Sequence, residues 1–177
     1  SRGLGDVYKR QPLFQPDFAR TVLKGCKKLG LHTCLDTSGH LGANADEELL
    51  ANTDLVLLDI KAWNPERYRA LAGGELRPTL EFAERLAALR KPVWLRYVLV
   101  PGLTDNMEDI TELSRHAARL GNVERVDVLP FHQMGRFKWD ELKLDYTLKD
   151  VPEPSEELTE QVRNIFRQEE NLKSSVH

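Results

Sequence analysis

Several side chains that could bind a charged ligand or transfer a proton lie at the ends of apolar runs in this sequence. Asp36 follows the run LHTCL, and Asp59 and Lys61 follow LVLL. Arg96 lies inside VWLRYVLV, and His132 follows VERVDVLPF. An arginine within an apolar run needs a carboxylate or an anionic ligand nearby, because an unpaired buried guanidinium is costly. These residue types predict either ion pairs or a site for a charged ligand.

Each of these residues, taken alone, also has a structural explanation. Asp36 is typical of a helix N-cap, and Asp59 with Lys61 is typical of an ion pair at a strand end. Arg96 is explained as a half-buried anchor that pairs with Asp59 or Asp127. What favours a functional site is their joint position, since independent structural pairs would seldom place polar groups at the same end of every strand.

The elements that must position these side chains alternate along the chain. Strand-like runs cover residues 31–36, 54–61, 93–100 and 123–132. Helical periodicity covers residues 18–29, 45–52, 64–72, 77–90, 105–120 and 153–169. This alternation, with short connections, predicts an α/β fold of parallel strands, either an open sheet or part of a (β/α) barrel. Ligands in both architectures bind beyond the carboxyl ends of the strands, so the candidate residues should converge there.

Composition excludes several other classes of protein. The 177 residues include 25 Lys plus Arg and 28 Asp plus Glu, and this balance argues against a nucleic-acid binder or a polybasic membrane anchor. No apolar run approaches the length of a membrane span, and the first residues have no signal-peptide core, so we expect a cytoplasmic protein. The two cysteines, Cys26 and Cys34, are expected to be buried, inert thiols.

Four stretches together show a family resemblance: HTCLDTSG, LVLLDIK, WLRYVLVPG and NVERVDVLPFHQMGRFKW. In order and spacing they resemble the pyruvate formate-lyase activating enzymes, which are radical S-adenosylmethionine oxidoreductases. The resemblance implies a partial (β/α) barrel of the radical SAM type, with about four parallel strands and flanking helices. It further implies that a [4Fe-4S] cluster cleaves S-adenosylmethionine to a 5'-deoxyadenosyl radical, which makes a glycyl radical on pyruvate formate-lyase. A flavodoxin-like electron donor is implied as a second partner.

The same resemblance implies roles for the candidate residues. Asp36 would accept a hydrogen bond from the amino group of S-adenosylmethionine, while Lys61 and Arg96 would meet its carboxylate. His132 would lie toward the ribose and adenine. The resemblance also implies a monovalent cation bound by oxygen atoms of Asp36, Thr37, Asp59 and the Leu57 carbonyl.

Part of the chain departs from the family. The family's Cys-x-x-x-Cys-x-x-Cys cluster motif does not occur here, so we expect the chain to be inactive alone. Residues 1–11 align with nothing in the family and are interpreted as an artefactual junction, which leaves 12–177 as the C-terminal part of a barrel domain. We therefore expect the first strand–helix units to be missing and the strand at 31–36 to be an exposed sheet edge.

Two other functions fit particular residues. Lys61 beside Asp59 suits a Schiff-base aldolase-like barrel, in which a lysine amine attacks a carbonyl. The segment FHQMGRFKWDELK, Phe131 to Lys143, mixes aromatic, Met and basic residues as binding surfaces do, which suggests a non-catalytic module that docks a glycyl-radical enzyme.

Overall fold

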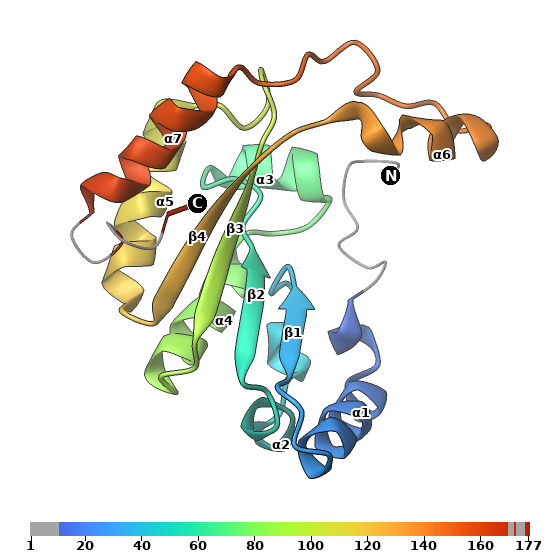
Figure 1. The fold of residues 1–177 in the computed structure, drawn as a ribbon, viewed down its shortest axis with the longest axis vertical. Helices are drawn as coiled ribbons and strands as arrows, with labels where there is room; N and C mark the ends of the chain where they lie inside the picture. Colours follow the sequence, from blue (N-terminus) through green and yellow to red (C-terminus); the bar gives the residue numbers. More distant parts are fainter. Residues whose placement is uncertain (1–10, 170–171, 173–175) are drawn as a thin grey trace.

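Four parallel strands form the centre of the fold: β1 (Cys34–Thr37), β2 (Leu55–Asp59), β3 (Val93–Leu99) and β4 (Val123–Pro130). They are hydrogen-bonded in the order β1-β2-β3-β4, and each neighbouring pair is parallel (Figure 1). β2, β3 and β4 lie within the ranges expected from the sequence, and β1 extends one residue past its expected range of 31–36, to Thr37. The predicted α/β fold with about four parallel strands is confirmed.

The structure is a computed structural model that describes residues 11–169, 172, 176 and 177. Most of the expected N-terminal junction, residues 1–10, lies outside the described residues. Over the described ranges, none of the helices combines the length and apolar character that a membrane crossing requires.

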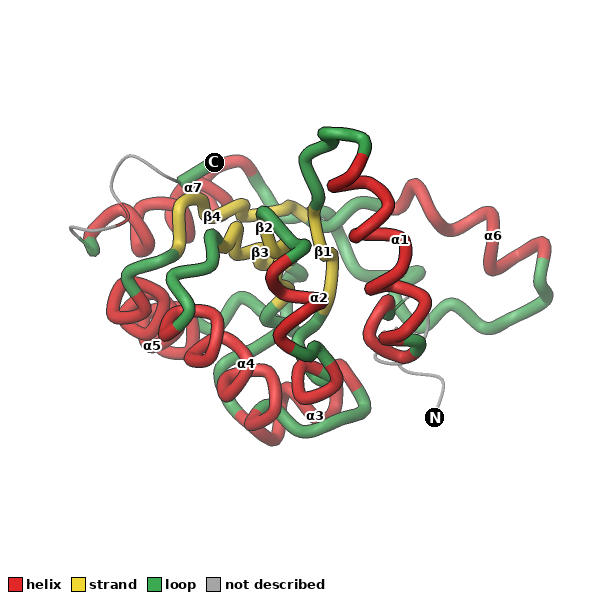
Figure 2. Tube along the Cα trace, turned by 90° about the horizontal axis from the view of Figure 1, so that it is seen from below, coloured by secondary structure: helices red, strands yellow, loops and turns green. Residues whose placement is uncertain are grey.

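Helices connect the strands and gather on one side of the sheet, where Figure 2 shows α2, α3, α4 and α5. Three of them begin at a side chain that caps a backbone N–H: Asp46 for α2, Asn64 for α3 and Asn106 for α5. The predicted helices all form, but α6 and the three 3-10 turns were not predicted, and the segment that contains η3 and α6 was interpreted as a polar tail. The bounds are α1 Pro16–Lys28, α2 Glu47–Ala51, α3 Pro65–Ala72, α4 Arg77–Ala88, α5 Met107–Leu120, α6 Arg136–Glu141 and α7 Glu156–Gln168, with short 3-10 turns η1 Pro12–Phe14, η2 Gly42–Asn44 and η3 Gln133–Gly135.

The two faces of the sheet differ in chemistry. Along β3, Leu95 and Tyr97 are buried among the core residues, while Trp94 and Arg96 are half-buried. Successive strand residues point to opposite faces, so this alternation separates a core face that packs against helices from a second face that carries polar side chains. We call the second face the open face and define it by Asp36, Asp59, Trp94, Arg96, Arg125 and Asp127.

Among the residues that the structure describes, β1 is an edge of the sheet, as predicted from the sequence. Cys34 is exposed and Cys26 on α1 is only half-buried, so the expectation of two buried thiols is wrong. Cys34 lies two residues before Asp36 and therefore shares the open face with it, whereas Leu35 and Thr37 point to the buried face of the same strand. On α1, Phe18 is 68% exposed and Val22 45% exposed, and both line a groove beside β1. Phe18 and Val22 of this helix therefore border the sheet edge, while Ala19 belongs to the core and Leu23 packs against it.

A buried histidine predicts how stability responds to acid. His116 on α5 is 8% exposed, and its ring centroid lies 5.0 Å from that of Trp63. Burial lowers the pKa of the His116 imidazole and the charge of Arg119 adds to this, while Glu84 opposes it. The unfolded chain therefore takes up a proton near pH 6.5 that the folded chain does not. The contribution of neutral His116 to stability is complete above about pH 6.5 and is lost as pH falls toward the lowered folded-state pKa.

We therefore expect His116→Phe to flatten the acid side of the stability profile. Phenylalanine keeps an aromatic ring against Trp63 but cannot take up a proton. Urea unfolding between about pH 7 and 5 measures the slope directly, because that slope reports the protons bound on unfolding. A variant whose free energy of unfolding falls as steeply as that of the wild type would contradict this assignment.

Candidate functional site

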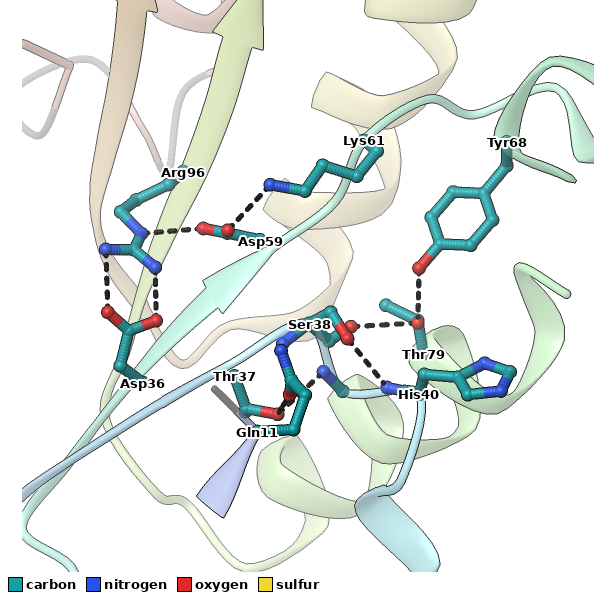
Figure 3. Close-up of polar contacts among 11 residues, drawn as sticks. Gln11, Asp36, Thr37, Ser38, His40, Asp59, Lys61, Tyr68, Thr79 and Arg96 are labelled. Atoms are coloured by element: carbon teal, nitrogen blue, oxygen red, sulfur yellow. Dashed lines mark hydrogen bonds and ion pairs between the residues drawn. The ribbon is translucent and has the colours of Figure 1, made fainter. Parts of the chain in front are cut away.

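Arg96 joins three strands on the open face. Its Nε donates to Oδ1 of Asp59 at 2.6 Å, and its Nη1 donates to Oδ2 of Asp36 at 3.1 Å, with a second bond from Nη2 to Oδ1 of Asp36. Lys61 Nζ donates to Oδ2 of the same Asp59 at 2.8 Å. Figure 3 shows the four side chains turned toward one another. Four of the predicted site residues therefore form one ion-pair cluster, which we call the Arg96 cluster.

Strand register explains why these residues meet. Asp59 pairs directly with Arg96 across β2 and β3, and Asp36 pairs with Leu57 on β2, one strand further toward the edge. Neighbouring strands lie about 4.8 Å apart, so a side chain as long as arginine reaches both acids. The structural explanations given for each residue alone, a helix N-cap for Asp36 and an Asp59–Lys61 ion pair, are therefore incomplete. Asp36 bonds Arg96, and Asp59 bonds both Lys61 and Arg96.

Burial divides the cluster into an inner part and a rim. The side chains of Arg96 and Asp59 are each 21% exposed, that of Lys61 is 33% exposed, and that of Asp36 is 58% exposed. Burial disfavours the charged Arg96 guanidinium, but the hydrogen bonds and charges of Asp36 and Asp59 outweigh this and raise its pKa. Two acids balance two bases, so the cluster as a whole is neutral.

Thr37 lies on the other side of β1 from Asp36. Its side chain is buried, and Oγ1 donates to Oε1 of Gln11 at 2.8 Å and accepts from the N–H of Gly39 at 3.1 Å. The Thr37 side chain is therefore committed to the chain segment around it, and the predicted monovalent cation remains a prediction. Within the residues that the structure describes, no group of three or more His, Cys, Asp or Glu side chains could hold a metal ion.

The loop that follows β1 is held by residues that the sequence reading missed. Thr79 Oγ1 donates to the Ser38 carbonyl at 2.9 Å and lies 2.9 Å from the hydroxyl of Tyr68 (Figure 3). Gln11, which was assigned to the N-terminal junction, accepts from the Ser38 N–H at 3.2 Å. These partners lie 27 to 41 residues from Ser38 in the chain, and no local spacing signals such contacts.

His132 lies apart from the Arg96 cluster. It follows β4 and stands five residues beyond Asp127, the register partner of Arg96, which is roughly 16 Å along a strand. His132 is exposed and lines a cleft of about 360 Å³ together with Glu153 and Arg163. Its predicted position toward the ribose and adenine is untested and remains a prediction.

The segment Phe131 to Lys143 extends away from the sheet in η3 and α6 (Figure 1). Met134 is 76% exposed and Phe137 is 55% exposed, whereas the ring of Trp139 lies 5.4 Å from that of Tyr146. The exposure of Met134 and Phe137 is compatible with a segment that docks a glycyl-radical enzyme, and that role remains a prediction.

The cysteines of this chain do not fit an iron-sulfur cluster. A [4Fe-4S] cluster is held by thiolates, and the sequence contains only Cys26 on α1 and Cys34 on β1. Desolvation raises the pKa of the Cys34 thiol, and the nearby Asp36 carboxylate raises it further, which opposes the thiolate form that iron requires. The Arg96 cluster, in contrast, offers both signs of charge, which is the donor chemistry that a zwitterionic amino-acid group requires.

Comparison with known proteins gives one family match. The sequence profile of the Radical SAM superfamily matches residues 10–114, more than half of the chain. The chain is 40% identical over 160 residues to pyruvate formate-lyase 1-activating enzyme of Escherichia coli (strain K12), covering 89% of this chain and 65% of that protein. It is also 40% identical over 161 residues to the pyruvate formate-lyase-activating enzyme of Streptococcus mutans, covering 88% of this chain and 61% of that one. The chain thus spans less than two thirds of the length of these relatives.

Solved structures show the same fold. A domain of pyruvate-formate lyase-activating enzyme from Bacteroides vulgatus superposes with a TM-score of 0.78 at 22% identity, covering 94% of this chain and 92% of that one. Streptococcus suis SuiB bound to S-adenosylmethionine superposes with a TM-score of 0.61 at 17% identity, covering 85% of this chain and 32% of SuiB. At these identities the superpositions establish the architecture.

Proposed function

Because this chain belongs to the radical SAM superfamily, we propose that its Arg96 cluster binds the amino-acid group of S-adenosylmethionine. The observation that carries the proposal is the bridge from Arg96 on β3 to Asp36 and Asp59, which lie at the carboxyl ends of β1 and β2. Arg96 and Lys61 would bind the ligand carboxylate, and Asp36 would accept from its ammonium group. The bound ligand supplies an adenosyl group on a sulfonium centre.

The exposure of each residue supports these roles. Asp36, at 58% exposed, is the acid that a ligand ammonium can reach without displacing a buried ion pair. Asp59 is more buried and holds both bases, so it would orient Lys61 and Arg96 while they bind the ligand. A neutral cluster exchanges its own ion pairs for those of a neutral zwitterion without leaving a net buried charge, which keeps the cost of desolvation low.

We further propose that the whole protein activates pyruvate formate-lyase, the reaction named in its relatives. The support is 40% identity over 89% of this chain. Pyruvate formate-lyase would be the partner, a flavodoxin-like protein would be the electron donor, and the cytoplasm would be the location. Because Cys26 and Cys34 do not fit a [4Fe-4S] cluster, we propose that this chain alone is inactive and contributes the site for S-adenosylmethionine.

The aldolase-like alternative fits the geometry less well. A Schiff-base lysine attacks as a free amine, whereas Lys61 Nζ is engaged in an ion pair with the Asp59 carboxylate at 2.8 Å. The Arg96 guanidinium, which also bonds Asp59, has no evident role in the attack of an amine on a carbonyl. The cluster therefore favours ligand binding over amine catalysis.

Titration calorimetry with S-adenosylmethionine tests the proposed site. We expect Asp36→Ala and Lys61→Met each to weaken binding by roughly ten- to a hundredfold, because each loses a charge-assisted hydrogen bond. Arg77→Met is the control, since that side chain is 87% exposed and pairs with Glu81 on its own helix. If Lys61 had only a structural role, Lys61→Met would lower the melting temperature and leave the affinity for S-adenosylmethionine unchanged. Unchanged affinity in both Asp36→Ala and Lys61→Met would refute the site.

A further inference from the structure

A second charged group lies beside the Arg96 cluster on the open face. Arg125 on β4 donates from Nε to Oδ1 of Asp127 at 2.7 Å, and its guanidinium carbon lies 4.8 Å from the ring centroid of Trp94 on β3. The Asp127 side chain is 15% exposed and that of Arg125 is 37% exposed. Trp94 and Arg125 are register partners, so the strand pairing itself places the cation over the ring. The indole thus holds Arg125 through a cation–π contact.

Strand register also places Asp127 next to Arg96. The two are direct partners across β3 and β4, just as Asp59 and Arg96 are partners across β2 and β3. Arg96 therefore has an acid in register on each side, yet its guanidinium bonds Asp59 and Asp36 while Asp127 bonds Arg125. An acid at this position without a base of its own would compete for Arg96, because opposite charges attract strongly where exposure to water is low.

We propose that Arg125, held by Trp94, is a positioning residue that neutralises Asp127 and so keeps Arg96 directed toward Asp36 and Asp59. The inference rests on the proposed function, since it names Arg96 as the group that meets the ligand carboxylate. Arg125 itself pairs with Trp94, two residues along the strands from the Arg96–Asp127 pair. Its effect on the ligand would therefore pass through Asp127 and Arg96.

The first test follows the Arg96 guanidinium without any ligand. In protein with ¹⁵N-labelled arginine, the side-chain Nε–H resonance of Arg96 is assigned by its loss in Arg96→Lys. We expect Arg125→Met to shift this resonance, because Asp127 then draws the guanidinium away from Asp59. Adding Asp127→Asn to Arg125→Met should return the resonance to its wild-type position, because the competing charge is gone. An Arg96 resonance that does not move in Arg125→Met would overturn the inference.

The second test measures S-adenosylmethionine affinity in the same variants. We expect binding to weaken about tenfold in Arg125→Met and to return to within about twofold of wild type in the Arg125→Met, Asp127→Asn double variant. Arg125→Lys keeps the positive charge beside Asp127 and should stay close to wild type. Arg115→Met is the matched control, since Arg115 lies on α5, is 53% exposed and pairs with Glu112.

The outcomes separate this inference from the proposed function. If wild-type protein binds no S-adenosylmethionine, the proposed function fails, while the Arg96 resonance still tests the positioning role. If wild type binds and the double variant stays as weak as Arg125→Met, Arg125 acts by some route other than Asp127 and the inference is overturned. A melting curve for each variant shows whether a loss of affinity merely follows a loss of folding.

Discussion

Arg96→Met is expected to weaken S-adenosylmethionine binding by more than about a hundredfold, because it removes the group that joins three strands at the site. The side chain makes hydrogen bonds to Asp36 and Asp59, and each bond to a charged group contributes roughly 1.5–3 kcal/mol. Stability should fall as well, by roughly 2–4 kcal/mol, because Asp36 loses the partner on which it bonds and Asp59, only 21% exposed, is left with Lys61. Calorimetric titration and urea unfolding measure the two effects separately.

Two further variants show whether the losses of affinity and of stability both come from the missing bridge between Arg96 and the two acids. Arg96→Lys keeps the charge, but a single ammonium cannot reproduce a planar fork that reaches two carboxylates, so affinity should recover only in part. Adding Asp36→Asn to Arg96→Met removes the Asp36 charge that Arg96 no longer balances, and should restore part of the stability without restoring affinity. If Arg96→Lys binds as tightly as wild type, the bridging geometry is not what the ligand uses.

Gly42→Ala should strongly destabilise the protein, through packing and not through charge. Gly42 is buried in η2, and a β-carbon there would overlap the ring and β-carbon of Phe82 on α4. Overpacking of a filled core costs typically 1–3 kcal/mol. For a chain of this size that lowers the melting temperature by roughly 2–4 °C for each kcal/mol lost. Thermal unfolding followed by circular dichroism measures the change.

Gly25→Ala is a matched control that should change stability in the opposite direction. Gly25 lies inside α1, and apart from its chain neighbours and the backbone of its own helix no described atom lies within 4 Å of the position that its β-carbon would occupy. Alanine in a helix interior is favoured over glycine by roughly 0.5–1 kcal/mol, so this variant should melt higher. Adding Phe82→Leu should recover part of the stability lost in Gly42→Ala, because it frees space for the new methyl group. Destabilisation of similar size in both glycine variants would contradict this account.

The resemblance found in the sequence and the fold found in the structure agree, and the reason is local. Each strand is a short apolar run, and most helices begin at a capping residue or a proline, such as Asn64 before Pro65 or Asn106 before α5. These signals lie within a few residues of the elements that they specify. Alternation of such elements permits only a small set of parallel architectures. The segment that was missed, α6, is six residues long and lacks such a signal.

Exposure was predicted less well than secondary structure. The run LHTCL reads as a buried strand, yet Cys34 and Asp36 are exposed and the apolar side chains of α1 border a groove. Hydrophobic periodicity shows which side chains share a face, but it does not show what covers that face. Coverage depends on sheet order, and in that order β1 is an edge.

For the candidate site, the sequence by itself determined which residues stand at strand ends and that their charges must be paired. Only the tertiary structure decided the pairing: Arg96 could have bonded Asp127 as readily as Asp59, since both are its register neighbours. We infer that the choice depends on Arg125, which lies over the Trp94 ring and bonds Asp127, and on Asp36, which lies 60 residues from Arg96 in the chain. Ion pairs between residues so far apart depend on strand register and on competing partners, and neither leaves a periodic signal in the sequence.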